Sequence, residues 1–226
     1  VGNGANGENG ATVELSLSLE ESRTQLGEKV DGLYPLYWSE GDAVAVNGIA
    51  STALTAEQAG SANALFTFDE SLTRPFNIVY PAPATGVAAV TEGCYPVTFP
   101  ATQTYTEGGF ASGAAPMYGY AAEGSEGAIQ LNHLTGVLRI AVKGDKVLRY
   151  ISVNSESSKI AGNFDINCST GVLTAHEDAS NNITMSFGEG LQLSADKASE
   201  IYIALPAGDH GVITITLNTT DPGEKM

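Results

Sequence analysis

The sequence predicts an all-β protein built from two β-sandwich domains in tandem, with little helix. The 226 residues include 26 Gly and 9 Pro, together with many Thr, Ser and Asn, which is the composition of a turn-rich β protein. Several short segments alternate apolar and polar residues, as strands with one buried face do. These segments recur about every 10 to 15 residues with turn residues between them, a spacing typical of sandwiches and not of βαβ folds.

The first strand is predicted within residues 11–23. Val13, Leu15, Leu17 and Leu19 alternate there with Glu and Ser, so one face of the strand is apolar and the other polar. Residues 1–10 are mostly Gly and Asn, and we expect them to form a flexible leader. Their G-x-G-x-x-G pattern is not expected to bind a nucleotide, because no strand precedes it and no helix follows it.

Further strands follow the same reasoning along the chain. They are expected at residues 43–46, 65–68, 76–80, 95–99, 137–142, 148–153, 160–166, 183–187, 201–205 and 212–217. Only residues 51–64 are rich in Ala, Glu and Gln, and Gly60 interrupts them. Any helix there is expected to have one or two turns.

An acidic, Gly-rich segment at residues 123–127 precedes a fresh run of predicted strands. Such a segment is a natural domain boundary, and we place the domains at residues 1–126 and 127–226. One continuous sandwich is the alternative. The last residues resemble a turn that enters another strand, so the C-terminal domain is expected to be incomplete at its C-terminal end.

The net charge of the chain argues against some classes of binding partner. The chain has 10 Lys+Arg against 26 Asp+Glu, a net charge of −16. This balance argues against nucleic acid and anionic membrane surfaces, because both require a basic face on the protein. No apolar stretch approaches the length of a membrane-spanning helix, which is about 20 residues.

No catalytic, cofactor-binding or metal-binding residues are predicted, and we expect the protein not to be an enzyme. Ser194 and Lys197 match S-x-x-K, but the companion motifs of serine acyl enzymes are missing, so a surface loop is expected. The three histidines are scattered, and no acidic cluster has the calcium-loop pattern. Cys94 and Cys168 could pair, although two unpaired buried thiols are the favoured interpretation.

Tyr34, Tyr37 and Trp38 form the one aromatic cluster of the sequence. Flat aromatic faces can stack on sugars or on partner side chains, so these residues are candidate ligand contacts. An aromatic group that enters a sandwich core is the ordinary alternative.

The order of several short motifs resembles that of the fimbrillin family, the lipoprotein-derived subunits of type V pili in anaerobic Gram-negative bacteria. The resemblance covers about residues 11–220. It rests on TVELSL (12–17), SRT (22–24), YWSEGDAVAV (37–46), IVYP (78–81), FPATQTY (99–105), APM (115–117), LNHLTGVLRI (131–140), IAGNF (160–164) and ALPAG (204–208).

The resemblance implies two Greek-key, transthyretin-like sandwiches, exported as a lipoprotein precursor to the outer membrane. It also implies an arginine-directed cut, here between Arg23 and Thr24, that removes the first strand. A strand of a neighbouring subunit would then fill the groove that Val13, Leu15, Leu17 and Leu19 plug beforehand. The expected function is therefore that of a stalk or tip subunit of a fimbria that contributes to cell adhesion, with no cofactor.

A second hypothesis is a surface-anchored adhesin that binds a glycan or a protein and does not polymerise. Both hypotheses place the protein at the cell surface, attached to the membrane only through a lipid anchor on the precursor.

Overall fold

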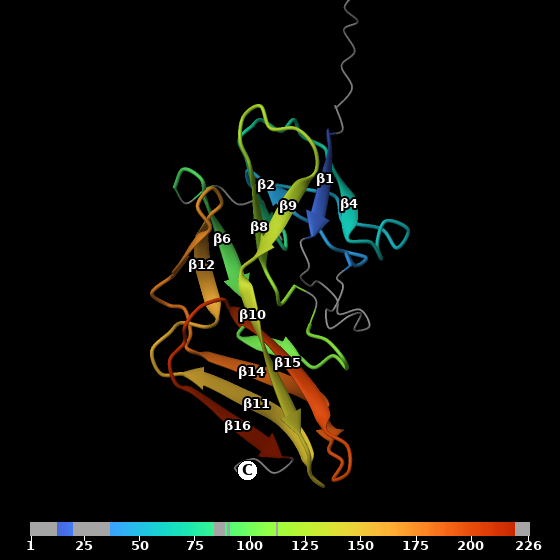
Figure 1. Cartoon of the computed structure of the whole chain (residues 1–226), viewed down its shortest axis with the longest axis vertical. Coiled ribbons are helices and arrows are strands. Elements are labelled where there is room, and N and C mark those ends of the chain that lie inside the picture. The colour runs from blue at the N-terminus through green and yellow to red at the C-terminus, as the bar shows by residue number, and fades with distance from the viewer. Residues whose placement is uncertain (1–12, 20–36, 84–88, 90, 112, 220–226) are drawn as a thin grey trace, which may run out of the picture.

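A computed structural model describes residues 13–19, 37–83, 89, 91–111 and 113–219, and only the backbone of Val13, Ser18 and Leu19. These residues form sixteen strands and no helix, so the all-β prediction is confirmed. Figure 1 shows an elongated molecule with an upper body that contains the first strand and a lower body that contains the last.

The upper body is organised around a seven-stranded sheet. Its order is β3 (Ile49–Ala50), β2 (Ala45–Val46), β5 (Phe76–Tyr80), β8 (Met117–Ala121), β9 (Ile129–His133), β1 (Val13–Leu19) and β4 (Asn63–Phe68). One face of this sheet holds the first hydrophobic core, which includes Phe66, Ile78 and Leu131. A two-residue turn, Asn47–Gly48, joins β2 to β3 with φ of 51° and 85°, the positive values that a type I′ hairpin requires.

A three-stranded sheet packs on part of the other face. It consists of β13 (Val172–Ala175), β12 (Gly162–Asn167) and β6 (Cys94–Phe99). Phe99, Phe164 and Ile166 of this sheet share a core with Val79 of β5, which gives the upper body two layers.

The lower body is a second sandwich. One layer has the order β16 (Ile213–Thr219), β11 (Val147–Ser155), β14 (Asn182–Gln192) and β7 (Thr102–Thr104), and the other pairs β10 (Thr135–Val142) with β15 (Ser199–Pro206). The core between the two layers is largely aliphatic, with Ile151, Met185 and Ile203 among its buried side chains.

Gln103 of β7 joins these two layers through its side chain, which is 1% exposed. The Gln103 Nε2 donates to the carbonyl oxygen of Ala204 at 2.6 Å, and the Ala204 N–H donates to Gln103 Oε1 at 3.0 Å. The amide thus pairs with β15 as a neighbouring strand would, and it satisfies two buried backbone groups.

No helix forms within residues 51–64, the stretch in which any helix was limited to one or two turns. The structure has a single hydrogen-bonded turn, in which the Ala59 N–H donates to the Thr55 carbonyl oxygen. Gly60 adopts a φ of +81°, outside the helical range, and β4 begins at Asn63. The glycine therefore ends the turn before a second turn can form.

The predicted domain boundary at residue 126 does not separate the strands of one sheet from those of another. β9 follows that boundary but belongs to the seven-stranded sheet, whereas β6 and β7 precede it and pair with β12 and β14. The chain therefore crosses between the upper and lower regions several times. The division into two independent domains stays a prediction.

Candidate functional site

The first strand lies in the interior of the seven-stranded sheet and not at its edge. β1 pairs antiparallel with β4, from Val13 opposite Phe68 to Ser18 opposite Asn63. On its other side it pairs parallel with β9, where Leu17 lies opposite Ile129 and Leu19 opposite Leu131. β1 therefore separates two strands that would otherwise both present an open edge.

The apolar side chains of β1 point into the upper core. Leu17 is fully buried and Leu15 is 7% exposed, whereas Glu14 and Ser16 are exposed. The alternation read from the sequence thus gives one core face and one solvent face for residues 14–17. Val13 and Leu19 continue the same pattern in sequence, and their side chains lie outside the described residues.

Arg23 and Thr24, the candidate processing site, also lie outside the described residues, as does Tyr34. The chain has three other arginines, and each is held by the fold. Arg74 donates to Ser125 Oγ at 2.7 Å and to the Ala122 carbonyl oxygen at 3.2 Å, Arg139 pairs with a carboxylate, and Arg149 donates to the Glu189 carbonyl oxygen at 2.5 Å.

Trp38 is a core residue, which agrees with the ordinary alternative for the aromatic cluster and not with a ligand contact at this position. Its side chain is 1% exposed, and its ring packs edge-on against Phe66 and Tyr80 with centroid distances of 4.9 and 5.4 Å. Burial of so large an apolar surface stabilises the core and leaves no face for a sugar or a partner. Tyr37 is 38% exposed, so the two neighbours do not form one surface.

A buried carboxylate beside Trp38 was not foreseen as a distinct feature. Asp42 is 6% exposed and accepts hydrogen bonds from the Tyr80 hydroxyl and from the Ser39 N–H, both at 2.7 Å. Burial raises the pKa of Asp42, and these two hydrogen bonds oppose that rise. Glu40, Gly41 and Asp42 are typical turn residues, and the contacts indicate that Asp42 fixes this turn against β5.

The S-x-x-K motif forms a turn between β14 and β15. Ser194 Oγ accepts the backbone N–H groups of Asp196 and Lys197 at 3.2 and 3.1 Å. This is a common way for serine to close a turn, and it agrees with the expected surface loop.

In the described part of the chain, no three or more His, Cys, Asp or Glu side chains come together in a way that could hold a metal ion. His176 Nε2 lies 3.0 Å from Asp165 Oδ1. Cys94 and Cys168 are both free thiols, and burial raises the pKa of Cys168 to about 12. The favoured interpretation of two unpaired cysteines therefore holds, although only Cys168 is fully buried.

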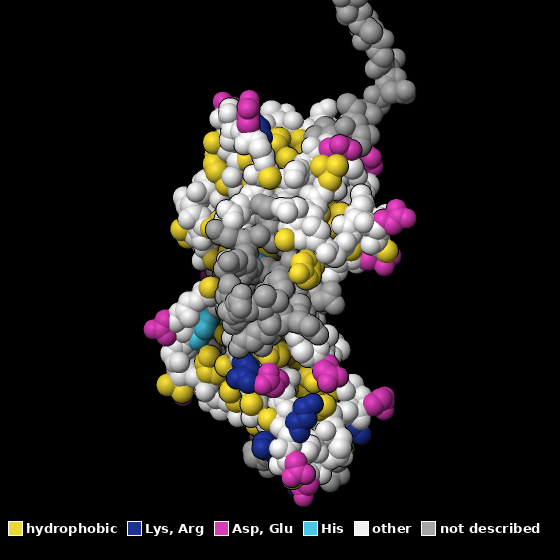
Figure 2. Space-filling model, turned by 45° about the vertical axis from the view of Figure 1, so that its right-hand side comes forward, with side chains coloured by type: hydrophobic (Ala, Val, Ile, Leu, Met, Phe, Trp, Pro, Cys, Tyr) yellow, Lys and Arg dark blue, Asp and Glu magenta, His cyan; other side chains and the backbone are white. Residues whose placement is uncertain are grey.

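In the described residues, no helix has the length and apolar character needed to cross a bilayer. The face in Figure 2 carries acidic side chains on both bodies, and most of its Lys and Arg lie on the lower body. On this face, the upper body is therefore less suited than the lower body to bind an anionic surface.

Comparison with known proteins adds evidence on the fold. The sequence matches no protein-family model and no curated protein. The structure is similar to the crystal structure, at 2.18 Å resolution, of a candidate cell adhesion protein from Bacteroides ovatus ATCC 8483. The TM-score is 0.53 at 13% sequence identity, and the match covers 96% of this chain and 86% of that chain. At this identity the likeness establishes a shared fold.

Proposed function

We propose that this protein is a subunit of a surface fimbria that assembles by strand exchange after its first strand is removed. The observation that carries the proposal is the position of β1, an interior strand contributed by the N-terminal part of the chain. The order of the fimbrillin-like motifs supports it, and so does the shared fold with a candidate cell adhesion protein. An origin as an exported, lipid-anchored precursor belongs to the same proposal.

All the pairing partners of β1 are distant in sequence. β4 begins at Asn63 and β9 at Ile129, whereas residues 20–36 separate β1 from the next described residue, Tyr37. A strand held only through distant pairings can be replaced by an equivalent strand of another chain without any change in the order of the sheet.

Loss of β1 would destabilise the subunit strongly. Burial of a leucine side chain contributes roughly 1.5 to 3 kcal/mol, so Leu15 and Leu17 together contribute about 3 to 6 kcal/mol. This is a large part of the total stability of a typical domain, which is about 5 to 15 kcal/mol. The backbone groups of β4 and β9 that face β1 would also lose their partners. Binding of a donor strand would therefore stabilise a cleaved subunit considerably.

The geometry also specifies the donor. It must run parallel to β9 and antiparallel to β4, and it must place an apolar side chain at every second residue to fill the positions of Leu15 and Leu17. The donor in the assembled fimbria would come from another subunit. For a test, a peptide of residues 11–20 of this chain reproduces the required pattern.

The test begins with limited digestion by an arginine-specific protease. We expect a selective cut after Arg23, because the other three arginines are hydrogen-bonded to the fold and cleavage there requires local unfolding. Mass analysis identifies the cut, and Arg23→Lys is the matched control that should resist it. The digested protein should then take up a labelled 11–20 peptide in size-exclusion chromatography.

A peptide with Leu15→Asn and Leu17→Asn is the control for the apolar slot, and it should not be retained. The proposal fails if the protease does not cleave the bond after Arg23. It also fails if the cleaved protein binds neither peptide and stays monomeric. In that case β1 is a permanent strand, and the non-polymerising adhesin becomes the better hypothesis.

A further inference from the structure

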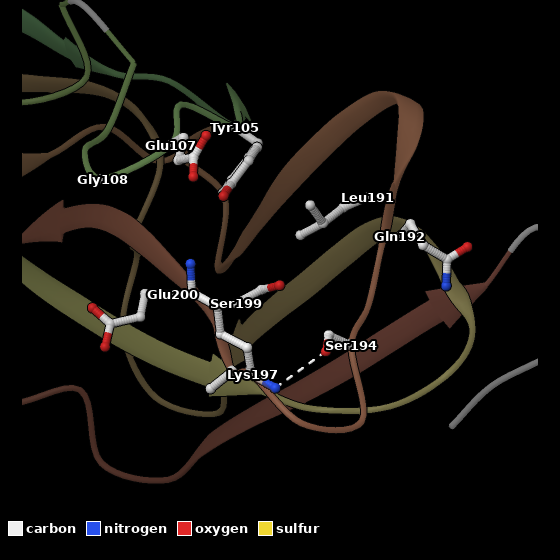
Figure 3. A pocket seen from close by; sticks show the side chains of 10 residues that line it. Tyr105, Glu107, Gly108, Leu191, Gln192, Ser194, Lys197, Ser199 and Glu200 are labelled. Atoms are coloured by element: carbon white, nitrogen blue, oxygen red, sulfur yellow. Dashed lines mark hydrogen bonds between the residues drawn. The ribbon is translucent and has the colours of Figure 1, made fainter.

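The lower body has a pocket that the strand-exchange proposal does not use. Its volume is about 450 Å³, within the usual range for small-ligand sites. It lies between the segment that follows β7 and the connection from β14 to β15 (Figure 3), and it is lined by Tyr105, Glu107, Gly108, Leu191, Gln192, Ser194, Lys197, Ala198, Ser199 and Glu200.

Polar groups of both signs converge on this space. In Figure 3 the Tyr105 hydroxyl points down from one wall with the Glu107 carboxylate beside it, and the Lys197 ammonium points up from the other. None of these three groups has a hydrogen bond or an ion pair with another side chain of the described residues. Burial, and to a smaller extent the charge of Glu107, raise the pKa of Tyr105. The phenol therefore remains protonated and can donate a hydrogen bond.

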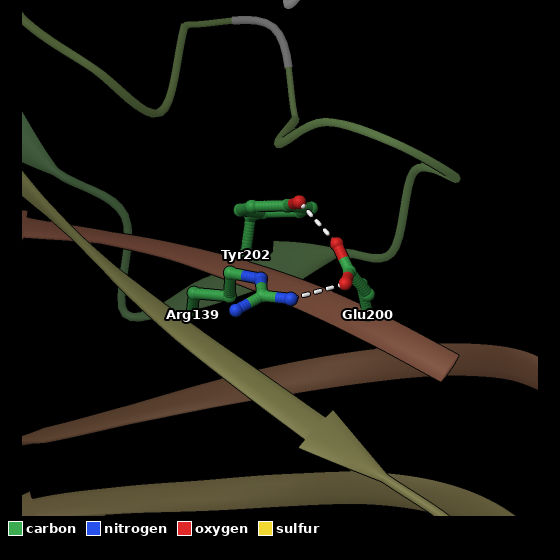
Figure 4. A network of polar contacts seen from close by, with 3 residues as sticks. All are labelled: Arg139, Glu200 and Tyr202. Carbon is green, nitrogen blue, oxygen red and sulfur yellow. Dashed lines mark hydrogen bonds and ion pairs between the residues drawn. The ribbon is translucent and has the colours of Figure 1, made fainter. Parts of the chain in front are cut away.

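The second carboxylate at the pocket, that of Glu200, is already engaged. It forms an ion pair with Arg139 of β10 and accepts a hydrogen bond from the Tyr202 hydroxyl at 2.6 Å (Figure 4). Figure 3 shows it directed away from the space between Tyr105 and Lys197. Glu107 is thus the carboxylate that the pocket offers to a ligand.

The pocket is also lined by apolar side-chain surface. The Tyr105 ring is supported by Phe187, with a centroid distance of 5.3 Å, and the Leu191 side chain projects into the space from β14. A ligand that fits must therefore have apolar C–H surface as well as donors and acceptors.

We propose that this pocket binds a neutral sugar residue. A sugar ring has C–H faces for Tyr105 and Leu191 and hydroxyl groups that both donate to Glu107 and accept from Lys197. An anionic ligand is disfavoured by the Glu107 carboxylate and by the net charge of −16. A purely apolar ligand would leave the charged groups desolvated and unpaired. The proposal does not depend on strand exchange, because β1 lies in the upper body.

Saturation-transfer NMR on the uncleaved protein tests it, with glucose, galactose, mannose and N-acetylglucosamine titrated separately and glucuronate as the anionic comparison. We expect saturable binding of at least one neutral sugar, with a dissociation constant of about 1 mM. Glu107→Gln and Tyr105→Phe should each weaken that binding about five- to tenfold. Glu177→Gln, an exposed carboxylate outside the pocket, is the matched control and should bind as the wild type does.

Two results would overturn the proposal. One is that no neutral sugar binds, whether or not glucuronate does. The other is binding that neither Glu107→Gln nor Tyr105→Phe weakens, since the sugar would then occupy another place. Circular dichroism of the variants confirms that each retains the β fold, and both substitutions keep nearly the volume of the original side chain.

Discussion

Replacement of Gln103 by leucine tests whether the side chain that joins the two layers of the lower body contributes to stability. Leucine has a similar size but cannot hydrogen-bond, so Gln103→Leu leaves the N–H and the carbonyl oxygen of Ala204 without their present partners. Ala204 itself is fully buried, and water cannot easily replace the amide.

An unsatisfied buried backbone group costs about 1 to 3 kcal/mol, so two cost about 2 to 6 kcal/mol. The added apolar burial of leucine offsets about 1 kcal/mol of this loss. We therefore expect a net loss of about 3 kcal/mol. For a chain of this length, that corresponds to a fall in Tm of about 6 to 12 °C.

Thermal and urea unfolding, monitored by circular dichroism, measure the change in stability. Thr104→Leu on the same strand is the control, because Thr104 is exposed and should change stability by less than about 0.5 kcal/mol. A loss below about 1 kcal/mol for Gln103→Leu would refute the reasoning. It would mean that the two sheets relax enough for Ala204 to find other partners.

Three further outcomes are expected. Leu17→Ala should destabilise the protein by about 3 kcal/mol in urea unfolding, because it opens a cavity at a fully buried position of β1; a change below about 1 kcal/mol would contradict the packing described. Thiol labelling at pH 8 should modify Cys94 in the native protein and Cys168 only after unfolding, since burial raises the pKa of Cys168 to about 12; equal native rates would contradict this. The hydrogen bond to Asp165 raises the pKa of His176 in the folded protein. The stability that protonated His176 adds to the fold is therefore fully present below its unfolded pKa of about 6.5, and it is lost as the pH rises through its folded pKa. His176→Gln should remove that decline from the pH dependence of Tm, and an NMR titration that finds no raised pKa would exclude the effect.

The sequence predicts the strands better than it predicts their partners. The alternation in β1 is local, so it indicates which side chains of the strand face the core. The pairing of β1 with β9 joins residues more than one hundred positions apart and depends on the packing of the whole upper core. β8 and β9 are not among the predicted strands, although they complete the seven-stranded sheet. β9 does alternate, with Ile129 and Leu131 buried and Gln130 and Asn132 exposed, but it has only five residues.

The candidate site shows the same limit. Leu15 and Leu17 were predicted correctly as buried, because period-two alternation identifies the core face of a strand. Trp38 was ambiguous, since exposed and buried aromatic residues look alike in sequence and only the contacts with Phe66 and Tyr80 decide between them. The pocket of the lower body could not be predicted either, because Tyr105 and Lys197 come from segments that only the fold brings together.

The crossings of the chain between the upper and lower regions have a consequence for how the protein folds. The seven strands of the upper sheet all lie within residues 13–133, but β6 cannot pair until β12 is available, nor β7 until β14. The sheets that contain β6 and β7 are therefore completed only when the C-terminal half of the chain is present. In a fold with so many distant pairings, large loops must close before the paired strands gain any contacts. Because this closure costs conformational entropy, the protein is expected to fold slowly. A fragment that ends at residue 126 would lack β9 and the partners of both strands, and it would expose strand edges prone to aggregation.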